Sequence, residues 1–109
     1  MVLHLQNDPF NSIKSGHKTI EMRLYDEKRR KLKENYIIEF INIKTNESIK
    51  VKIMKLHLFD NFDELYKKFD KSVLGYKEFE DETPNDMNKY YSKEEQEKYG
   101  VIGIEIKLI

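Results

Sequence analysis

The chain has 109 residues, of which 37% are charged, and its 20 Lys and Arg are balanced by 20 Asp and Glu. This length allows one domain with a single hydrophobic core, and the lack of cysteine excludes disulfides, thiolate metal sites and cysteine nucleophiles. A net charge of zero argues against a protein that holds long nucleic acid by bulk electrostatics alone. The apolar runs are far too short for a membrane span, and residues 1–10 lack a signal layout. We therefore expect a cytoplasmic protein with no membrane partner, folded as one domain over residues 1–109.

The first 35 residues predict a strand, a short helix and a second strand. Residues 2–6 have a strand pattern, and Asp8 followed by Pro9 predicts a helix that Asp8 caps and that Gly16 ends. The second strand follows directly. Residues 26–33 are charged and turn-like, so we expect no regular strand or long helix there.

Two strands joined by a tight turn come next. Residues 36–43 predict a strand and residues 45–47 a hairpin turn. In residues 49–59 the apolar side chains switch from odd to even positions, which predicts a β-bulge near Ile53.

Helical signals occupy the segment before the last strand. Apolar residues at helical spacing predict a helix over residues 61–69, and a second helix is expected over residues 83–91. Ser92 with Glu95 has the capping-box pattern of one further turn, which Gly100 ends.

The closing segment, residues 101–109, alternates apolar and polar side chains and predicts a half-buried strand. The middle strands are joined by hairpins rather than by helical crossovers. This order favours an α+β fold, a small five-stranded β-barrel with helices flanking its ends.

The second strand sorts its side chains into two sets of different chemistry. Because successive strand side chains alternate, Ile20, Met22 and Leu24 share one face, which predicts core. The opposite face carries polar groups, with a lysine at the strand entrance: Thr19, Glu21, Arg23, Tyr25 and Lys18. We expect this polar face to line a water-poor hollow that binds a ligand.

Positive charge is concentrated in the first half of the chain. Residues 1–57 carry 12 Lys and Arg against 7 Asp and Glu, and the remaining residues carry 8 against 13. Four basic side chains suit contacts with RNA phosphates, and one more suits a ligand contact: Lys28, Arg29, Arg30 and Lys31, and Lys14. A solvated, highly charged surface is the other interpretation of these runs.

Aromatic residues add candidates for stacking on bases. Tyr90 and Tyr91 cannot both face inward from one helix, and we expect Tyr91 to be the one at the cleft rim. The three histidines have no metal-ligand spacing, and the four glycines form no phosphate-binding loop. We therefore expect neither a metal nor a cofactor.

Several motifs together resemble the ASCH domain family. They are Pro9-Phe10, residues 13–16 (Ile-Lys-Ser-Gly), residues 18–21 (Lys-Thr-Ile-Glu) with Arg23, residues 74–76 (Leu-Gly-Tyr) and residues 99–101 (Tyr-Gly-Val). The resemblance implies a β-barrel similar to that of PUA domains, which are RNA-binding modules, with a cleft lined by the motif at residues 18–23. It also implies RNA or a nucleoside or nucleotide as ligand. One branch of the family resembles an amidohydrolase that removes the acetyl group from N4-acetylcytidine, and another resembles a ribonuclease.

Three residues of this motif carry the expected chemistry. Lys18, shielded by a cleft, would act as a base with a lowered pKa or donate to a developing oxyanion. Arg23 would contact the ligand through its planar fork, and Glu21 would orient Arg23 or act as a general base. A structural ion pair is the plain interpretation of Glu21 with Arg23. Since the amidohydrolase branch has a threonine where this chain has Glu21, a hydrolase here would need a carboxylate-activated water.

The leading expectation is an RNA- or nucleoside-interacting domain. Its catalytic candidates are Lys18 and Glu21, and its substrate-binding candidates are Arg23, Lys14, Thr19, Tyr25 and Tyr91. The alternatives are a metal-independent hydrolase acting on an acylated nucleoside or on RNA, and a non-catalytic protein-interaction module. Residues 77–82 are acidic without periodicity, a pattern that allows an ordered segment or a mobile lid.

Overall fold

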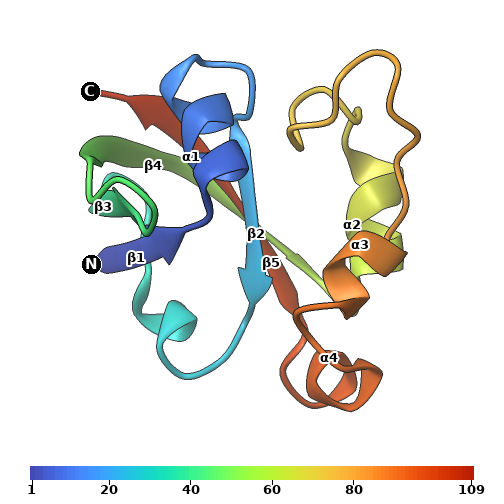
Figure 1. Ribbon diagram of the computed structural model, residues 1–109. Helices are drawn as coiled ribbons and strands as arrows, with labels where there is room; N and C mark the ends of the chain where they lie inside the picture. The colour runs from blue at the N-terminus through green and yellow to red at the C-terminus, as the bar shows by residue number, and fades with distance from the viewer.

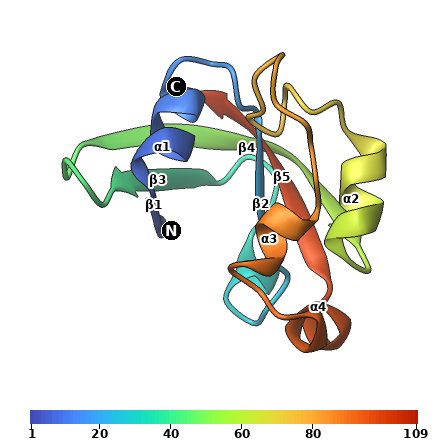
Figure 2. The ribbon, with the colours of Figure 1, turned by 45° about the vertical axis from the view of Figure 1, so that its right-hand side comes forward.

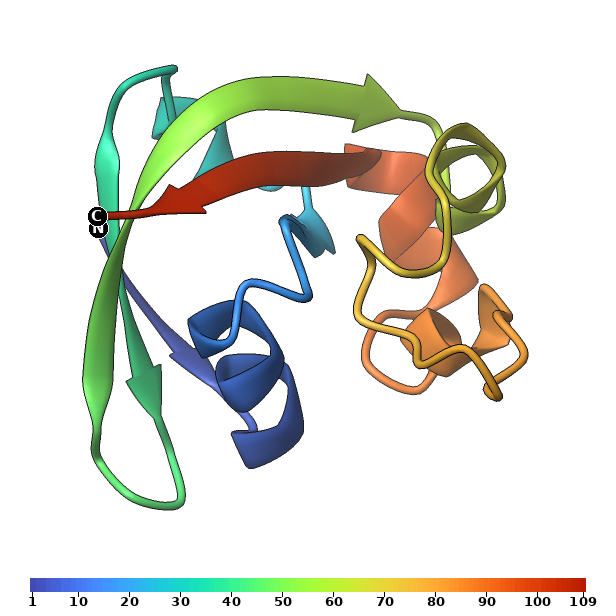
Figure 3. The same ribbon diagram turned by 90° about the horizontal axis from the view of Figure 1, so that it is seen from above.

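A single five-stranded sheet organises the chain, and the computed structural model describes all of residues 1–109. Its strands are β1 (Val2–Leu5), β2 (Ile20–Leu24), β3 (Ile37–Asn42), β4 (Ser48–Phe59) and β5 (Val101–Leu108). Their order across the sheet is β1-β3-β4-β5-β2, with β1 parallel to β3 and all other neighbours antiparallel. The sheet curls into an open barrel, as the view from above shows (Figure 3).

Four α-helices and one 3-10 turn connect the strands. They are α1 (Asn7–Lys14), η1 (Arg29–Lys31), α2 (Phe62–Lys68), α3 (Asn85–Asn88) and α4 (Lys93–Tyr99). The helix α1 lies on the barrel side of β2, whereas α2, α3 and α4 lie together on its other side (Figures 1 and 2). None of these helices has the length and apolar character needed to cross a membrane.

Two hydrophobic cores lie on either side of β2. The core inside the barrel has twelve buried residues, among them Phe10 of α1, Ile38 and Phe40. The second core, between β2 and the helices, has eight, among them Met22 and Phe62. Because β2 separates the two cores, both of its faces are covered.

The predicted fold class and several predicted local features are confirmed. The chain is α+β, with five strands in one curled sheet and flanking helices. A bulge interrupts β4 between Ile53 and Lys55, and Asn46 takes a φ of 62° in the hairpin turn. Ser92 and Glu95 form the predicted capping box of α4. These predictions hold because each signal depends on local backbone chemistry.

The start of α1 differs from the prediction. The helix begins at Asn7, so Asp8 lies in the first turn and is not the cap. The Asn7 side chain accepts hydrogen bonds from Asn11 at 3.2 Å and from Asn42 at 3.0 Å. These bonds tie the first turn of the helix to β3, a contact between distant segments that sequence spacing does not report.

The helix predicted over residues 83–91 is shorter, and the last strand is more buried than predicted. The carbonyl of Met87 accepts from the N–H groups of both Tyr90 and Tyr91, which ends α3 in a turn. The strand β5 pairs with β4 on one side and β2 on the other, and Val101 to Ile104 are all buried. Its central place in the sheet covers both faces of its first half, so the half-buried prediction is wrong there.

Candidate functional site

Lys18 and Glu21, the two predicted catalytic residues, form a buried ion cluster with Arg23. Lys18 Nζ lies 3.0 Å from Glu21 Oε1, while Arg23 Nη2 and Nε lie 3.1 and 3.3 Å from Glu21 Oε2. The N–H of Met22 also donates to Oε1, at 3.0 Å. Lys18 is 8% exposed and Glu21 is 3% exposed, so the three charges are held by one another rather than by water.

The electrostatics of this cluster fix the charge of Glu21. Burial alone would raise the pKa of its carboxyl group. The cations Lys18 and Arg23, together with the hydrogen bonds from Lys18 and Met22, outweigh burial and hold that pKa below its usual range. Glu21 is therefore a carboxylate with both oxygens engaged, and one positive charge remains on the cluster.

The polar face of β2 is turned toward the barrel. Arg23 Nη2 donates to the carbonyl oxygen of His4 in β1 at 3.1 Å, and Tyr25 packs against the barrel core. The face predicted to be plain core is covered by the helices, yet its Met22 reaches a surface cleft. Arg23 therefore bridges the two edge strands of the open barrel, while the apolar face contributes to a cleft wall.

That cleft, of about 930 Å³, lies between α1 and α3 beside the start of β2. Its walls come from α1, the residues that lead into β2, residues 74–77 and α3. Lys18 is the one member of the ion cluster that lines it. Gly75 packs directly on the Lys18 stem, since a Cβ placed on this glycine would lie 3.2 Å from Lys18 Cδ.

A chain of hydroxyl groups that ends on a carboxylate lines the same cleft. The hydroxyl oxygens of Tyr66 and Tyr76 lie 2.9 Å apart, and Tyr76 donates to Asp86 Oδ2 at 2.7 Å. Burial raises the pKa of both phenols, and for Tyr76 the hydrogen bonds to Tyr66 and Asp86 raise it further. Both tyrosines therefore keep their protons at neutral pH.

Sequence reasoning missed this network. The helical spacing of Tyr66 predicts a core residue. Asp86 follows an acidic segment, a pattern typical of solvated surface. The members come from α2, from the loop after it and from α3, so no common spacing links them. Only the packing of these three segments brings the groups together.

Tyr90, not Tyr91, is the exposed tyrosine at the cleft rim. Tyr90 is 65% exposed and lines the cleft, whereas Tyr91 stacks on Phe62 with ring centroids 5.8 Å apart. The turn at the end of α3 directs the ring of Tyr91 inward. Burial raises the pKa of Tyr91, and the neighbouring charges of Arg23 and Glu21 act on it in opposite directions.

The predicted phosphate contacts gather around η1, at the opposite end of β2 from Lys18. Arg29 pairs with Asp26 at 3.0 Å, and the Arg30 guanidinium lies 4.5 Å above the ring of Tyr25. The two lysines of this segment are exposed: Lys28 and Lys31. These four basic side chains form a surface separate from the cleft.

Two further predicted contacts also lie outside the cleft lining. Lys14, at the end of α1, forms a surface ion pair with Glu47. Thr19 is half-buried, and its backbone bonds to Val73 and Ile106 hold the start of β2 in place.

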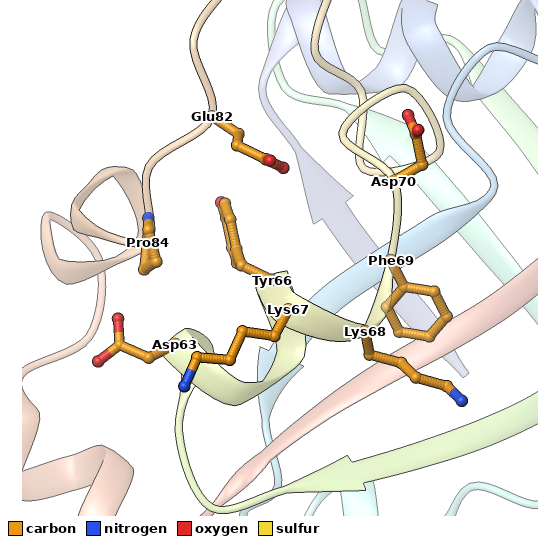
Figure 4. A pocket seen from close by; sticks show the side chains of 8 residues that line it. All are labelled: Asp63, Tyr66, Lys67, Lys68, Phe69, Asp70, Glu82 and Pro84. Carbon is orange, nitrogen blue, oxygen red and sulfur yellow. The ribbon is translucent and has the colours of Figure 1, made fainter.

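A second hollow, of about 720 Å³, lies between α2 and the segment that carries Glu82 and Pro84 (Figure 4). Most of its lining is charged or polar: Asp63, Tyr66, Lys67, Lys68, Phe69, Asp70, Glu82 and Pro84. Figure 4 shows the Tyr66 ring rising from α2 with its hydroxyl toward Glu82, while the lysine side chains point away from it. Tyr66 lines both this hollow and the cleft.

A family model described as the ASCH domain matches residues 3–109. Among solved structures, the hypothetical protein PH0355 is 33% identical with a TM-score of 0.82, over 99% of this chain and 97% of that chain. Protein PF0455 from Pyrococcus furiosus is 30% identical with a TM-score of 0.70, over 99% and 96%. ASCH from Zymomonas mobilis has a TM-score of 0.67 over 97% of this chain and 65% of that chain, and its 14% identity shows likeness of fold alone. No protein of curated function matches. The family match spans nearly the whole sequence, and the chain belongs to the ASCH domain family.

Proposed function

We propose that the cleft between α1 and α3 binds RNA or a nucleoside or nucleotide, with Lys18 as its charged contact. The observation that carries this proposal is a buried ammonium group, held by Glu21, on the wall of a cleft of about 930 Å³. Small-molecule sites typically have volumes of about 300–1,000 Å³, so a nucleotide fits. Membership of a family that resembles RNA-binding modules supports the same ligand class.

The rest of the lining suits a base and a sugar. Met22 and Met87 offer apolar surface for a flat ring, and the exposed ring of Tyr90 stands at the rim, where it can stack on a base. Ser12 also lines the cleft, although its Oγ is buried and has no protein partner.

Behind the cleft wall, Glu21 acts as a positioning residue for Lys18. Its four contacts engage both carboxylate oxygens, and its pKa lies below the usual carboxyl range, which is the reverse of what a general base at neutral pH needs. The same contacts hold the Lys18 ammonium at the cleft wall. Binding accounts for this geometry more directly than hydrolysis by an activated water does.

Substitution of Lys18 tests the proposal. Lys18→Met keeps the stem that packs against Gly75 and removes the charge. A hydrogen bond to a charged group contributes about 1.5–3 kcal/mol, so we expect the variant to bind nucleoside monophosphates about tenfold or more weakly. Affinity is measured by titrating isotope-labelled protein and following its chemical shifts.

Lys67→Met is the matched control, because Lys67 is exposed on α2 and pairs only with Glu64 at 3.2 Å. It should bind as the wild type does, and thermal melts of both variants confirm that they are folded. Equal affinity of Lys18→Met and wild type for nucleoside monophosphates would show that Lys18 does not contact the ligand. Failure of the wild type to bind any nucleoside monophosphate or short RNA would reject the proposed function.

A further inference from the structure

The hydrogen bonds of the Tyr66–Tyr76–Asp86 chain have one possible direction. A phenol has a single proton, and a carboxylate has none to give. Tyr76 gives its proton to Asp86 at 2.7 Å, a short, charge-assisted bond, with the Thr83 carbonyl as a second acceptor at 3.3 Å. The bond of 2.9 Å between the two hydroxyls must then be donated by Tyr66.

This direction leaves the Tyr66 hydroxyl with lone pairs only, while Lys89 on the cleft wall lies 3.9 Å from the other oxygen of Asp86. The Tyr66 oxygen and the carboxylate of Asp86 can both accept, and neither has a proton left to donate. Asp86 and Glu82 add negative potential around Tyr66, since both carboxylates raise the pKa of its phenol. A ligand carbonyl placed against the Tyr66 hydroxyl would face an acceptor without a donor, whereas a ligand N–H would be bound there.

Lys18 supplies the opposite chemistry in the same cleft. Its ammonium group donates and cannot accept, and the cluster of Lys18, Glu21 and Arg23 keeps one net positive charge. A ligand that satisfies both ends carries an acceptor toward Lys18 and an N–H donor toward Tyr66. The amino-bearing edges of cytosine and adenine have this layout, because a ring or carbonyl acceptor lies beside an exocyclic amino group.

We infer that the Tyr66–Tyr76–Asp86 chain is a specificity device, which selects bases with an exocyclic amino group over bases with a carbonyl in its place. The inference rests on the proposed function and deepens it. Tyr66 would touch the ligand, and Tyr76 and Asp86 would act through Tyr66 by fixing the direction of its proton.

Two pairs of nucleotides provide the test, because uracil and hypoxanthine, held in the same orientation as cytosine and adenine, present a carbonyl in place of the amino group and a ring N–H in place of the ring acceptor. CMP is compared with UMP, and AMP with IMP, by chemical-shift titration of the whole chain. For the wild type we expect the amino member of each pair to bind about tenfold more tightly, which is the effect of one hydrogen bond gained against one acceptor left unpaired.

Variants of the chain then test its direction. In Tyr76→Phe the Tyr66 proton is free to turn toward the ligand, so a carbonyl can be bound and the ratio of affinities should fall toward one. Tyr66→Phe removes the accepting oxygen itself and should also bring the ratio toward one, which covers the case that Tyr76→Phe does not fold. Tyr36→Phe removes the hydroxyl of a tyrosine that is 49% exposed and not part of the cleft lining, and should keep the wild-type ratio.

The outcomes separate this inference from the function on which it rests. Equal affinity of the wild type for both members of each pair overturns the selectivity and leaves nucleotide binding in place. An unchanged ratio in both Tyr76→Phe and Tyr66→Phe also overturns it. Binding of none of the four nucleotides rejects the proposed function, and the inference falls with it.

Discussion

Glu21 is the residue on which two buried cations depend. Lys18 and Arg23 share its carboxylate at 3.0 and 3.1 Å, and removing one member of a buried ion pair costs about 3–5 kcal/mol. The side-chain oxygen of glutamine can still accept the hydrogen bond from the Met22 N–H, which reduces this cost. We therefore expect Glu21→Gln to lower the free energy of unfolding by about 3 kcal/mol at pH 7. Urea denaturation of the two proteins measures the difference.

The stabilisation by Glu21 depends on pH in a defined direction. Its pKa in the folded protein lies below the ordinary value of 4.5, so the stabilisation is complete above that value and is lost as pH falls through the lowered pKa. The difference in the free energy of unfolding between wild type and Glu21→Gln should therefore become smaller in acid. Glu64→Gln, on the exposed surface of α2, is the control and should change stability by less than about 0.5 kcal/mol at either pH. A difference for Glu21→Gln that is as large in acid as at pH 7 would contradict this account.

At the scale of single residues, the alternation of side chains along a strand predicts part of the ion cluster. Glu21 and Arg23 lie two residues apart on β2, so their pairing follows from the period of a strand. Lys18 precedes the first residue of β2 and follows Gly16, where φ is +84°. Alternation does not apply there, so the contact between Lys18 and Glu21 depends on how the loop returns from α1.

At the scale of elements, the loop that carries Gly75 shapes the Lys18 wall of the cleft. Gly75 has a φ of +103°, and a Cβ added to it would lie 3.2 Å from Lys18 Cδ. Gly16 has a φ of +84°, and a Cβ added there would meet open space. Alanine at either position costs about 1 kcal/mol through backbone strain. We expect only Gly75→Ala to displace Lys18 and also weaken nucleotide binding severalfold.

The two glycine variants are compared by urea denaturation and by nucleotide titration. Gly16→Ala is the matched control, since it has the same strain without the Lys18 contact. Equal nucleotide affinity of the two variants would show that the contact between Gly75 and Lys18 has no part in binding.

Sequence patterns predict some features of these elements and not others. The bulge in β4, the positive φ of Asn46 and the Ser92 capping box follow from neighbouring residues, and each was predictable. The burial of both faces of β2 and β5 was not, because it comes from helices and strands far away in the sequence. The Tyr66–Tyr76–Asp86 chain was unpredictable for the same reason.

At the scale of the whole molecule, β2 places two different surfaces at its two ends. The cleft with Lys18 lies at its start, and the basic surface around η1 follows its end. The cleft is large enough for one nucleotide, so an RNA that extends beyond it can reach further surface. The overall charge of zero means that any salt-dependent attraction must come from such a local basic surface.

Salt dependence distinguishes the contributions of these two surfaces. Each phosphate contact on single-stranded nucleic acid adds about 0.7 to the slope of log affinity against log salt concentration. Lys28 and Lys31 are exposed around η1, so we expect the double variant Lys28→Ala, Lys31→Ala to reduce this slope by about 1.4 for a short single-stranded RNA. Its affinity for CMP should stay as in the wild type, because neither lysine lines the cleft. The control is Lys67→Ala with Lys68→Ala, which removes two exposed lysines from α2. An unchanged slope in the η1 variant, or an equal reduction in the α2 variant, would show that the basic surface around η1 does not contact RNA.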